Sequence, residues 1–114
     1  TLNFLSPASS SSSVANTTDI QHCKSYYRQW ESKAGHWINN FTKEQAWFKV
    51  NKNTTVSQLE LTGHQRSRND ARAQLKNIQS MLQSYRSRAA KAGGSIPKSN
   101  IESQIDALLN QPNY

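Results

Sequence analysis

The stretch from Ala71 to Ala92 reads ARAQLKNIQSMLQSYRSRAAKA, and its apolar residues recur at alternating steps of four and three. Residues at these steps share one face of an α-helix. A second stretch, from Ile20 to Phe41, has the same spacing, and one of its rows continues to Phe48. Two such faces in one short chain predict two long helices that pack against each other. The faces comprise Ala71, Leu75, Ile78, Leu82, Tyr85, Ala89 and Ala92, and Ile20, Cys23, Tyr27, Trp30, Ala34, Trp37 and Phe41.

The first helix is expected over about 19–50, with its N-cap in the cluster Thr17-Thr18-Asp19. Gly35 and the pair Asn39-Asn40 weaken its middle. One helix bent near 39–42 and two separate helices therefore stay open as alternatives. The segment 51–55 is rich in turn-forming residues and ends this part of the hairpin.

The second helix is predicted to begin at Ser67, because Ser67 and Asp70 have the spacing of a capping box. It should end at about Ala92, before Gly93-Gly94. The intervening residues 56–62 suit a short strand as well as a helix start, and we interpret them as an irregular entry into the helix.

A third, short helix is predicted over about 100–110, because Ser99 and Glu102 form a capping box and Pro112 follows the last apolar residues. The expected fold is all-α: an antiparallel helical hairpin with a short C-terminal helix, together a small three-helix bundle. We assign residues 18–114 to this single domain and residues 1–17, rich in Ser and Thr, to a flexible leader or tether. The aromatic faces need a third helix or a second copy of the chain to cover them, so a homodimer is an open alternative.

The composition indicates a basic chain with a thin core. It has 114 residues, a net charge of +7 and 34% hydrophobic residues, and no run reaches the ~20 apolar residues of a membrane span. Cys23, the single cysteine, is interpreted as a buried thiol, with an interchain bridge or a reactive thiol as the alternatives. Because Ser, Asn, Gln and Thr dominate the polar positions, we expect a periplasmic or secreted location.

Catalysis is not indicated by the sequence. His22, His36 and His64 are scattered, and the chain lacks a Gly-rich phosphate loop, paired carboxylates and a nucleophile elbow. We therefore expect a protein that is not an enzyme, with no metal ion and no cofactor.

Basic residues concentrate in the predicted second helix. Between Gly63 and Ala92 there are seven basic residues and one acid, Asp70. Such a face either keeps the helix soluble or docks an anionic partner, and arginine contacts carboxylates and phosphates in a bidentate manner. Tyr26 and Trp47 fall beside the first apolar face and are further candidates for partner contact. The basic candidates are Arg66, Arg68, Arg72, Lys76, Arg86, Arg88 and Lys91.

The leading functional hypothesis is an extracytoplasmic adaptor or assembly module that docks an acidic protein or another anionic macromolecule through this basic helix. A nucleic-acid-binding protein that uses the same helix is the first alternative, although no known DNA- or RNA-binding signature is present. The stretch Leu61-Thr62-Gly63-His64-Gln65-Arg66 resembles the Leu-Thr-x-x-Gln motif of small periplasmic helical stress chaperones. The resemblance implies an all-helical, basic, cradle-shaped chaperone that holds unfolded proteins, which is the second alternative.

Overall fold

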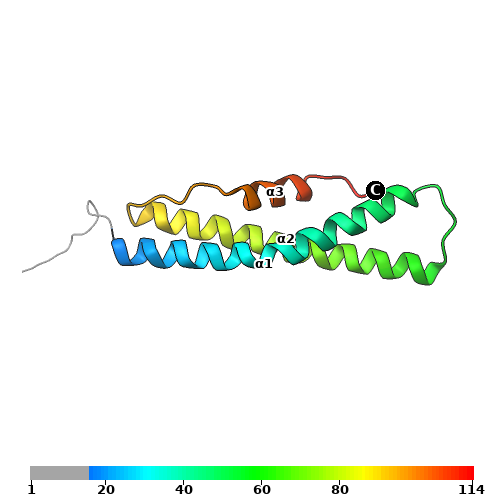
Figure 1. Ribbon diagram of the computed structural model, residues 1–114, viewed down its shortest axis with the longest axis horizontal. Coiled ribbons are helices and arrows are strands. Elements are labelled where there is room, and N and C mark those ends of the chain that lie inside the picture. Colours follow the sequence, from blue (N-terminus) through cyan, green and yellow to red (C-terminus); the bar gives the residue numbers. More distant parts are fainter. Residues whose placement is uncertain (1–15) are drawn as a thin grey trace, which may run out of the picture.

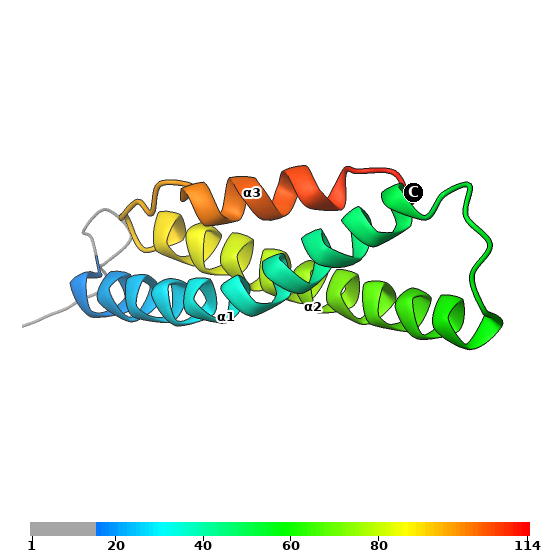
Figure 2. The ribbon, with the colours of Figure 1, turned by 45° about the vertical axis from the view of Figure 1, so that its right-hand side comes forward.

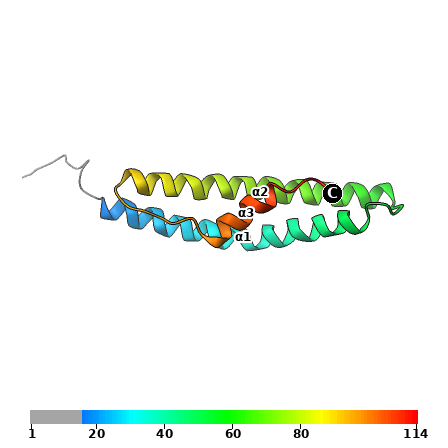
Figure 3. The same ribbon diagram turned by 90° about the horizontal axis from the view of Figure 1, so that it is seen from above.

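The computed structural model describes residues 16–114, which form three α-helices: α1 (Thr17–Val50), α2 (Gln58–Lys91) and α3 (Asn100–Leu109). The helices α1 and α2 run antiparallel and cross near their middles (Figure 1). The short helix α3 packs against both of them on one side of the hairpin (Figure 2). Seen from above, α1 and α2 lie side by side and α3 lies across both of them (Figure 3). The predicted all-α hairpin with a short C-terminal helix is confirmed.

The start of α1 differs slightly from the prediction. Its N-cap is Asn16, whose side chain accepts a hydrogen bond from the backbone N–H of Asp19 at 3.1 Å, so the predicted cap within residues 17–19 is wrong. The backbone N–H of Asn16 also donates to the carbonyl of Ala92 at 2.8 Å, which ties the start of α1 to the end of α2. Of the predicted leader, residues 1–15 lie outside the described residues, while Thr17 is already helical. Between the two alternatives for 39–42, one continuous helix is correct.

The helix α2 begins at Gln58, well before the predicted Ser67. Ser57 is its N-cap and accepts a hydrogen bond from the backbone N–H of Glu60 at 3.1 Å. Ser57 and Glu60 have the same capping-box spacing that suggested Ser67, so the sequence offered two starts and the earlier one is used. Gly63 does not end this helix, because a mid-helix glycine costs only about 1 kcal/mol.

The other end of α2 stops where the two glycines predicted it. Gly93 has a positive φ of 89°, a conformation that an L-amino acid with a side chain rarely adopts. At Gly94 a Cβ atom would stand 2.7–2.8 Å from side-chain atoms of Ile20. Gly94 therefore lets the turn after α2 approach the first turns of α1.

The core lies where the three helices meet, and both predicted apolar faces contribute to it. Cys23 is a buried free thiol, as interpreted from the sequence. Trp30 and Trp37 are only half-buried and pack at the edge of the core, whereas Ile38, outside the predicted face, is buried. The buried cluster consists of Tyr27, Ala34, Ile38, Phe41, Ala71, Leu75, Ile78, Leu82, Ile105 and Leu108.

Candidate functional site

The basic residues predicted to bind a partner separate into two groups in the structure. Four of them are exposed to solvent: Arg66, Lys76, Arg88 and Lys91, which we name the outer face. The other three, Arg68, Arg72 and Arg86, point toward α1, α3 or the segment that follows α3, where they make hydrogen bonds within the chain.

The outer face forms one surface of α2. At about 100° per residue, its four side chains fall within an arc of roughly 120°, on the side of α2 opposite the buried Leu75 and Leu82. Among residues 16–114 the ion pairs are His64–Glu44, Arg86–Glu102 and Lys98–Asp106, so none of them neutralises the outer face. Asp70 is the one acidic residue exposed on this side of the helix. The outer face is therefore a solvated strip of net positive charge.

Arg86 serves the interior of the chain instead. Its guanidinium donates two hydrogen bonds to the Glu102 carboxylate, from Nε at 2.8 Å and from Nη2 at 2.6 Å. The Glu102 side chain is fully buried, and the Arg86 side chain is 29% exposed. These bonds raise the pKa of Arg86, and this bidentate pair attaches α3 to α2.

Tyr27 completes this network from α1. Its hydroxyl donates to Glu102 Oε1 at 2.6 Å and accepts from the backbone N–H of Ser99 at 3.1 Å. Burial raises the pKa of the Tyr27 hydroxyl, and the bond to Glu102 acts in the same direction. Ser99 Oγ accepts from the Glu102 N–H at 3.1 Å, as a capping box requires. In a complete capping box the Glu102 carboxylate would also accept from the Ser99 N–H. Here the carboxylate accepts from Tyr27 and Arg86 instead, and the Ser99 N–H donates to the Tyr27 hydroxyl.

Arg68 lies in the interior, although the apolar face predicted from the sequence begins only at Ala71. It is 7% exposed, and its guanidinium carbon stands 3.7 Å from the centre of the Phe48 ring. Its Nη1 donates to Gln45 Oε1 at 3.1 Å and to the backbone oxygen of Tyr114 at 3.2 Å. Burial lowers the pKa of Arg68, and the charge of Arg72 lowers it further, while Glu44 opposes them. Arg68 is thus unsuited to a docking surface on the outside of α2.

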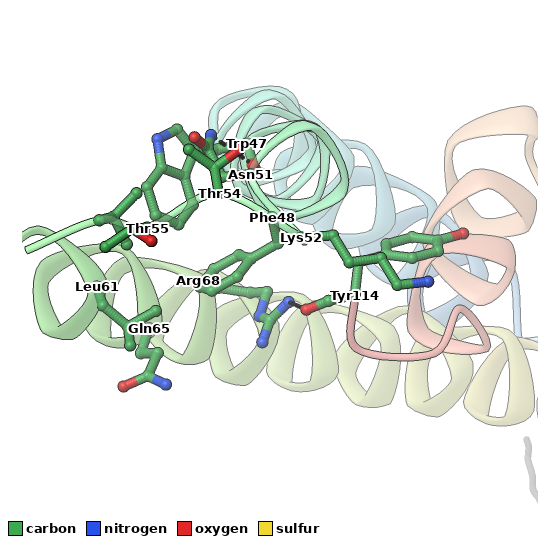
Figure 4. A pocket seen from close by; sticks show the side chains of 11 residues that line it. Trp47, Phe48, Asn51, Lys52, Thr54, Thr55, Leu61, Gln65, Arg68 and Tyr114 are labelled. Carbon is green, nitrogen blue, oxygen red and sulfur yellow. Dashed lines mark hydrogen bonds between the residues drawn. The ribbon is translucent and has the colours of Figure 1, made fainter.

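A pocket of about 490 Å³ adjoins Arg68 at the end of the hairpin (Figure 4). We name it the hairpin pocket. It is open to solvent and lies between the last turns of α1, the first turns of α2 and the segment that joins them. Its lining combines aromatic, aliphatic, hydroxyl and basic side chains: Trp47, Phe48, Asn51, Lys52, Thr54, Thr55, Val56, Leu61, Gln65, Arg68 and Tyr114.

The two aromatic candidates lie in different places. Tyr26 is 47% exposed and stacks on Tyr85 with 5.4 Å between ring centres. Arg88 lies 5.9 Å from the Tyr85 ring, so Tyr26 borders one end of the outer face. Trp47, about 30 Å further along α1, stacks on His64 at 3.8 Å and lines the hairpin pocket. The structure thus brings Tyr26, and not Trp47, to the basic strip.

Several polar residues near the pocket were not identified from the sequence as a site. His64 Nδ1 contacts Glu44 Oε1 at 2.5 Å, and Gln45 and Glu44 are both buried. The signal that could have found them is the polar break in the apolar rows, at Glu44 on α1 and at Arg68 on α2.

Within residues 16–114 there is no cluster of three or more His, Cys, Asp or Glu side chains placed to hold a metal ion. In the same range no helix has the length and apolar character needed to cross a membrane.

Comparisons with protein-family models, with curated proteins and with solved structures gave no match for this chain.

Proposed function

We propose that the chain is a non-enzymatic interaction module that docks an acidic protein surface through the outer face of α2. One observation carries the proposal: Arg66, Lys76, Arg88 and Lys91 are exposed along one side of α2 and have no carboxylate partner among residues 16–114. The chain's buried acids Glu44 and Glu102 are paired inside with His64 and Arg86. Charges left in water on one side of a rigid helix attract an oppositely charged partner over about a Debye length.

Rigidity supports the same proposal. The helix that presents these charges is 34 residues long and is fixed on its other side by the core and by the Arg86–Glu102 pair. A partner therefore meets charges at fixed spacing and does not have to order a flexible segment, which lowers the entropic cost of binding. The extracytoplasmic location and the tethering role of the leader stay predictions from composition.

The test compares two fourfold charge reversals that change the net charge equally. One variant carries R66E, K76E, R88E and K91E on the outer face; the control carries K24E, K33E, K43E and K49E on α1. Binding of the labelled chain to poly-L-glutamate is measured by fluorescence anisotropy at 50 and 200 mM salt. We expect the affinity for poly-L-glutamate to fall at least tenfold in the outer-face variant and by less in the control. The helicity of both variants, measured by circular dichroism, should be unchanged. Equal losses in both variants would refute a specific docking face.

The same assay separates the alternatives. Single- and double-stranded DNA and RNA replace the polyglutamate, with heparin as competitor. The nucleic-acid alternative would be favoured by binding to a polynucleotide that is tighter than binding to polyglutamate and that heparin does not displace. For four phosphate contacts, the slope of log K against log salt should be about −3.6. Suppressed aggregation of unrelated unfolded proteins, unaffected by the outer-face variant, would favour the chaperone alternative.

A further inference from the structure

One side of the hairpin carries a group of aromatic and apolar residues that are only partly buried. On α1, Tyr26, Trp30 and Trp37 follow one another at steps of four and seven residues, so they share one side of the helix. Tyr26 is 47% exposed, and both tryptophans are half-buried at the edge of the core. On α2, Met81 and Tyr85 are also half-buried. We name these five residues the aromatic face.

The aromatic face lies on the side of the hairpin away from α3. The stack of Tyr26 on Tyr85 brings the contributions of α1 and α2 to the same side. At about 100° per residue, Met81 and Tyr85 lie roughly 130° around α2 from Gln79 and Arg86, which bond α3. The helix α3 covers the other side of the hairpin (Figure 2). No third helix within residues 16–114 therefore covers the aromatic face.

Both edges of the aromatic face carry a positive charge. On α1, Lys33 Nζ lies 5.4 Å from the centre of the Trp30 ring. On α2, the guanidinium carbon of Arg88 lies 5.9 Å from the centre of the Tyr85 ring. Both cations are exposed, and neither forms an ion pair with a residue of the described range. An apolar surface with charged edges is typical of a protein interaction site, and the charges here select an acidic partner.

The helix α3 shows what kind of segment this hairpin holds. Its sequence, Asn100–Leu109, contains two acids and no basic residue. One side of α3 is apolar and buried, and its acids Glu102 and Asp106 pair with an arginine and a lysine of the chain. On the opposite side of the hairpin, the stretch from Tyr26 to Trp37 is about 17 Å long. A second short helix with an apolar side and acidic edges matches both the length and the charges of the aromatic face.

Other occupants fit less well. A second copy of the chain would bring Lys33 and Arg88 against the same two cations, since the exposed acids Asp19 and Asp70 lie beyond the ends of the aromatic face. Residues 1–15 contain no acid that could pair with these cations. A flat bilayer is best reached by protruding side chains, whereas the two tryptophans are half-buried. The charges and the burial together favour a helix from another protein.

We propose that the aromatic face binds an acidic amphipathic helix of a partner protein. Apolar side chains of that helix contact Tyr26, Trp30 and Trp37, and its carboxylates pair with Lys33 and Arg88. The inference rests on the proposed function, because Arg88 also belongs to the outer face, and it names the segment that the acidic partner presents. Burial of the aromatic rings supplies affinity, and the two charge pairs fix the orientation of the bound helix.

The test is a titration of the ¹⁵N-labelled full chain with designed peptides, observed by NMR. The first peptide has about 18 residues, enough for partial helicity on its own, with leucine at steps of three and four and glutamate on both flanks. The second has the same composition in shuffled order, without an apolar side. The third has lysine in place of each glutamate. We expect saturable shifts of the Trp30 and Trp37 indole N–H signals, little change at Trp47, and at least tenfold weaker binding of the other two peptides.

Substitutions locate the bound peptide on the chain. Tyr26→Ala should weaken binding of the first peptide at least fivefold, because it removes an exposed ring from the aromatic face. Tyr114→Ala is the matched control, since Tyr114 is 40% exposed and lies outside this face, and it should leave the affinity unchanged. Lys33→Glu should weaken binding about fivefold, and Lys43→Glu, exposed on another side of α1, should weaken it less. Circular dichroism checks that each variant stays helical.

Several results would overturn the proposal. They are equal binding of the first peptide and the shuffled peptide, shifts centred on Trp47, or a Tyr26→Ala variant with the original affinity. A dimer of the free chain that Tyr26→Ala dissociates, observed by sedimentation, would assign the aromatic face to a second copy instead. Anionic lipid vesicles that shift the Trp30 and Trp37 signals, when the first peptide does not, would assign it to a membrane.

Failure of the proposed function gives a different result. It would appear as equal losses of polyglutamate binding in the two fourfold charge variants, which change no aromatic residue. The preference for the first peptide over the shuffled peptide plays no part in that comparison. Equal binding of these two peptides, together with a specific loss in the outer-face variant, would leave the acidic partner in place and remove only the amphipathic helix.

Discussion

Glu102 and Arg86 form a bidentate pair in which the carboxylate is fully buried and the guanidinium closes one side of it. The pair joins α3 to α2 and, through Glu102 Oε1, to Tyr27 on α1. Arg86, which the sequence indicated as a partner contact, therefore holds α3 in place on α2. Its removal should affect stability and not docking.

Arg86→Met should lower the free energy of unfolding by about 3 kcal/mol, because it leaves the buried Glu102 carboxylate with the Tyr27 hydroxyl as its one remaining donor among residues 16–114. Glu102→Leu together with Arg86→Met should recover part of this loss, since the apolar pair leaves no buried charge. Urea denaturation of the two single variants and the double variant measures the coupling. Additive losses would contradict a direct interaction between the two side chains.

Gly35, Gly63 and Gly94 should respond in opposite directions to replacement by alanine. Gly35 and Gly63 are exposed within helices, and a Cβ at either meets nothing within 4 Å. Gly35→Ala and Gly63→Ala should each raise the free energy of unfolding by about 0.5–1 kcal/mol, because alanine loses less backbone entropy on folding. Gly94→Ala is the matched control and should lower it, since its Cβ would stand 2.7–2.8 Å from Ile20. A Gly94→Ala variant that is more stable than the parent chain would show that the Ile20 side chain can move away from the new Cβ without a loss of unfolding free energy.

A pH dependence follows from Asp106 on α3. Its carboxylate pairs with Lys98 and accepts from Gln79 Nε2 at 2.6 Å. Burial opposes its ionisation, but the hydrogen bonds from Lys98 and Gln79 outweigh burial and lower the pKa of Asp106 below its ordinary value. A carboxyl group whose pKa is lower in the folded state stabilises the fold above its unfolded pKa and ceases to do so as the pH falls through the folded value.

Asp106→Asn should therefore cost about 0.5–1 kcal/mol near neutral pH, a modest value because both partners are partly exposed. The difference between the parent chain and Asp106→Asn should shrink as the pH falls below about 4. Urea denaturation of both proteins from pH 6 to pH 2 measures it. A difference that grows on acidification would have the wrong sign for this assignment.

Much of the fold could be predicted from spacing alone, because steps of three and four residues define a helical face without further information. The third helix was also predictable, since Ser99 and Glu102 are local capping signals. The burial of Arg68 was not predictable from the sequence. It occupies the register of the apolar face, yet the oxygens that make its burial tolerable come from Gln45 and Tyr114, 23 and 46 residues away. A one-dimensional pattern identifies the face but not such distant partners.

The same limit explains the start of α2 and the role of Glu102. Two serines, Ser57 and Ser67, each precede an acid by three residues, and only the packing of His64 on Trp47 and the burial of Arg68 favour the earlier start. Glu102 was recognised as a capping residue, but its carboxylate is used by Tyr27 and Arg86 on the other two helices. Local signals thus placed the end of α2 and the start of α3 correctly. They did not reveal the contacts that join α3 to the other two helices.

Tyr27→Phe tests how α3 is held in place. The change removes the hydroxyl that donates to Glu102 and accepts from the Ser99 N–H, so a buried carboxylate loses a donor and a cap loses an acceptor. We expect a loss of about 1–3 kcal/mol in unfolding free energy. Amide hydrogen exchange should accelerate mainly in α3, because that helix makes far less contact with the hairpin than α1 and α2 make with each other. Tyr26→Phe is the matched control, because the Tyr26 ring is exposed. It should change neither the free energy of unfolding nor the rate of hydrogen exchange in α3. Uniform acceleration across all three helices would instead show that α3 and the hairpin open as one unit.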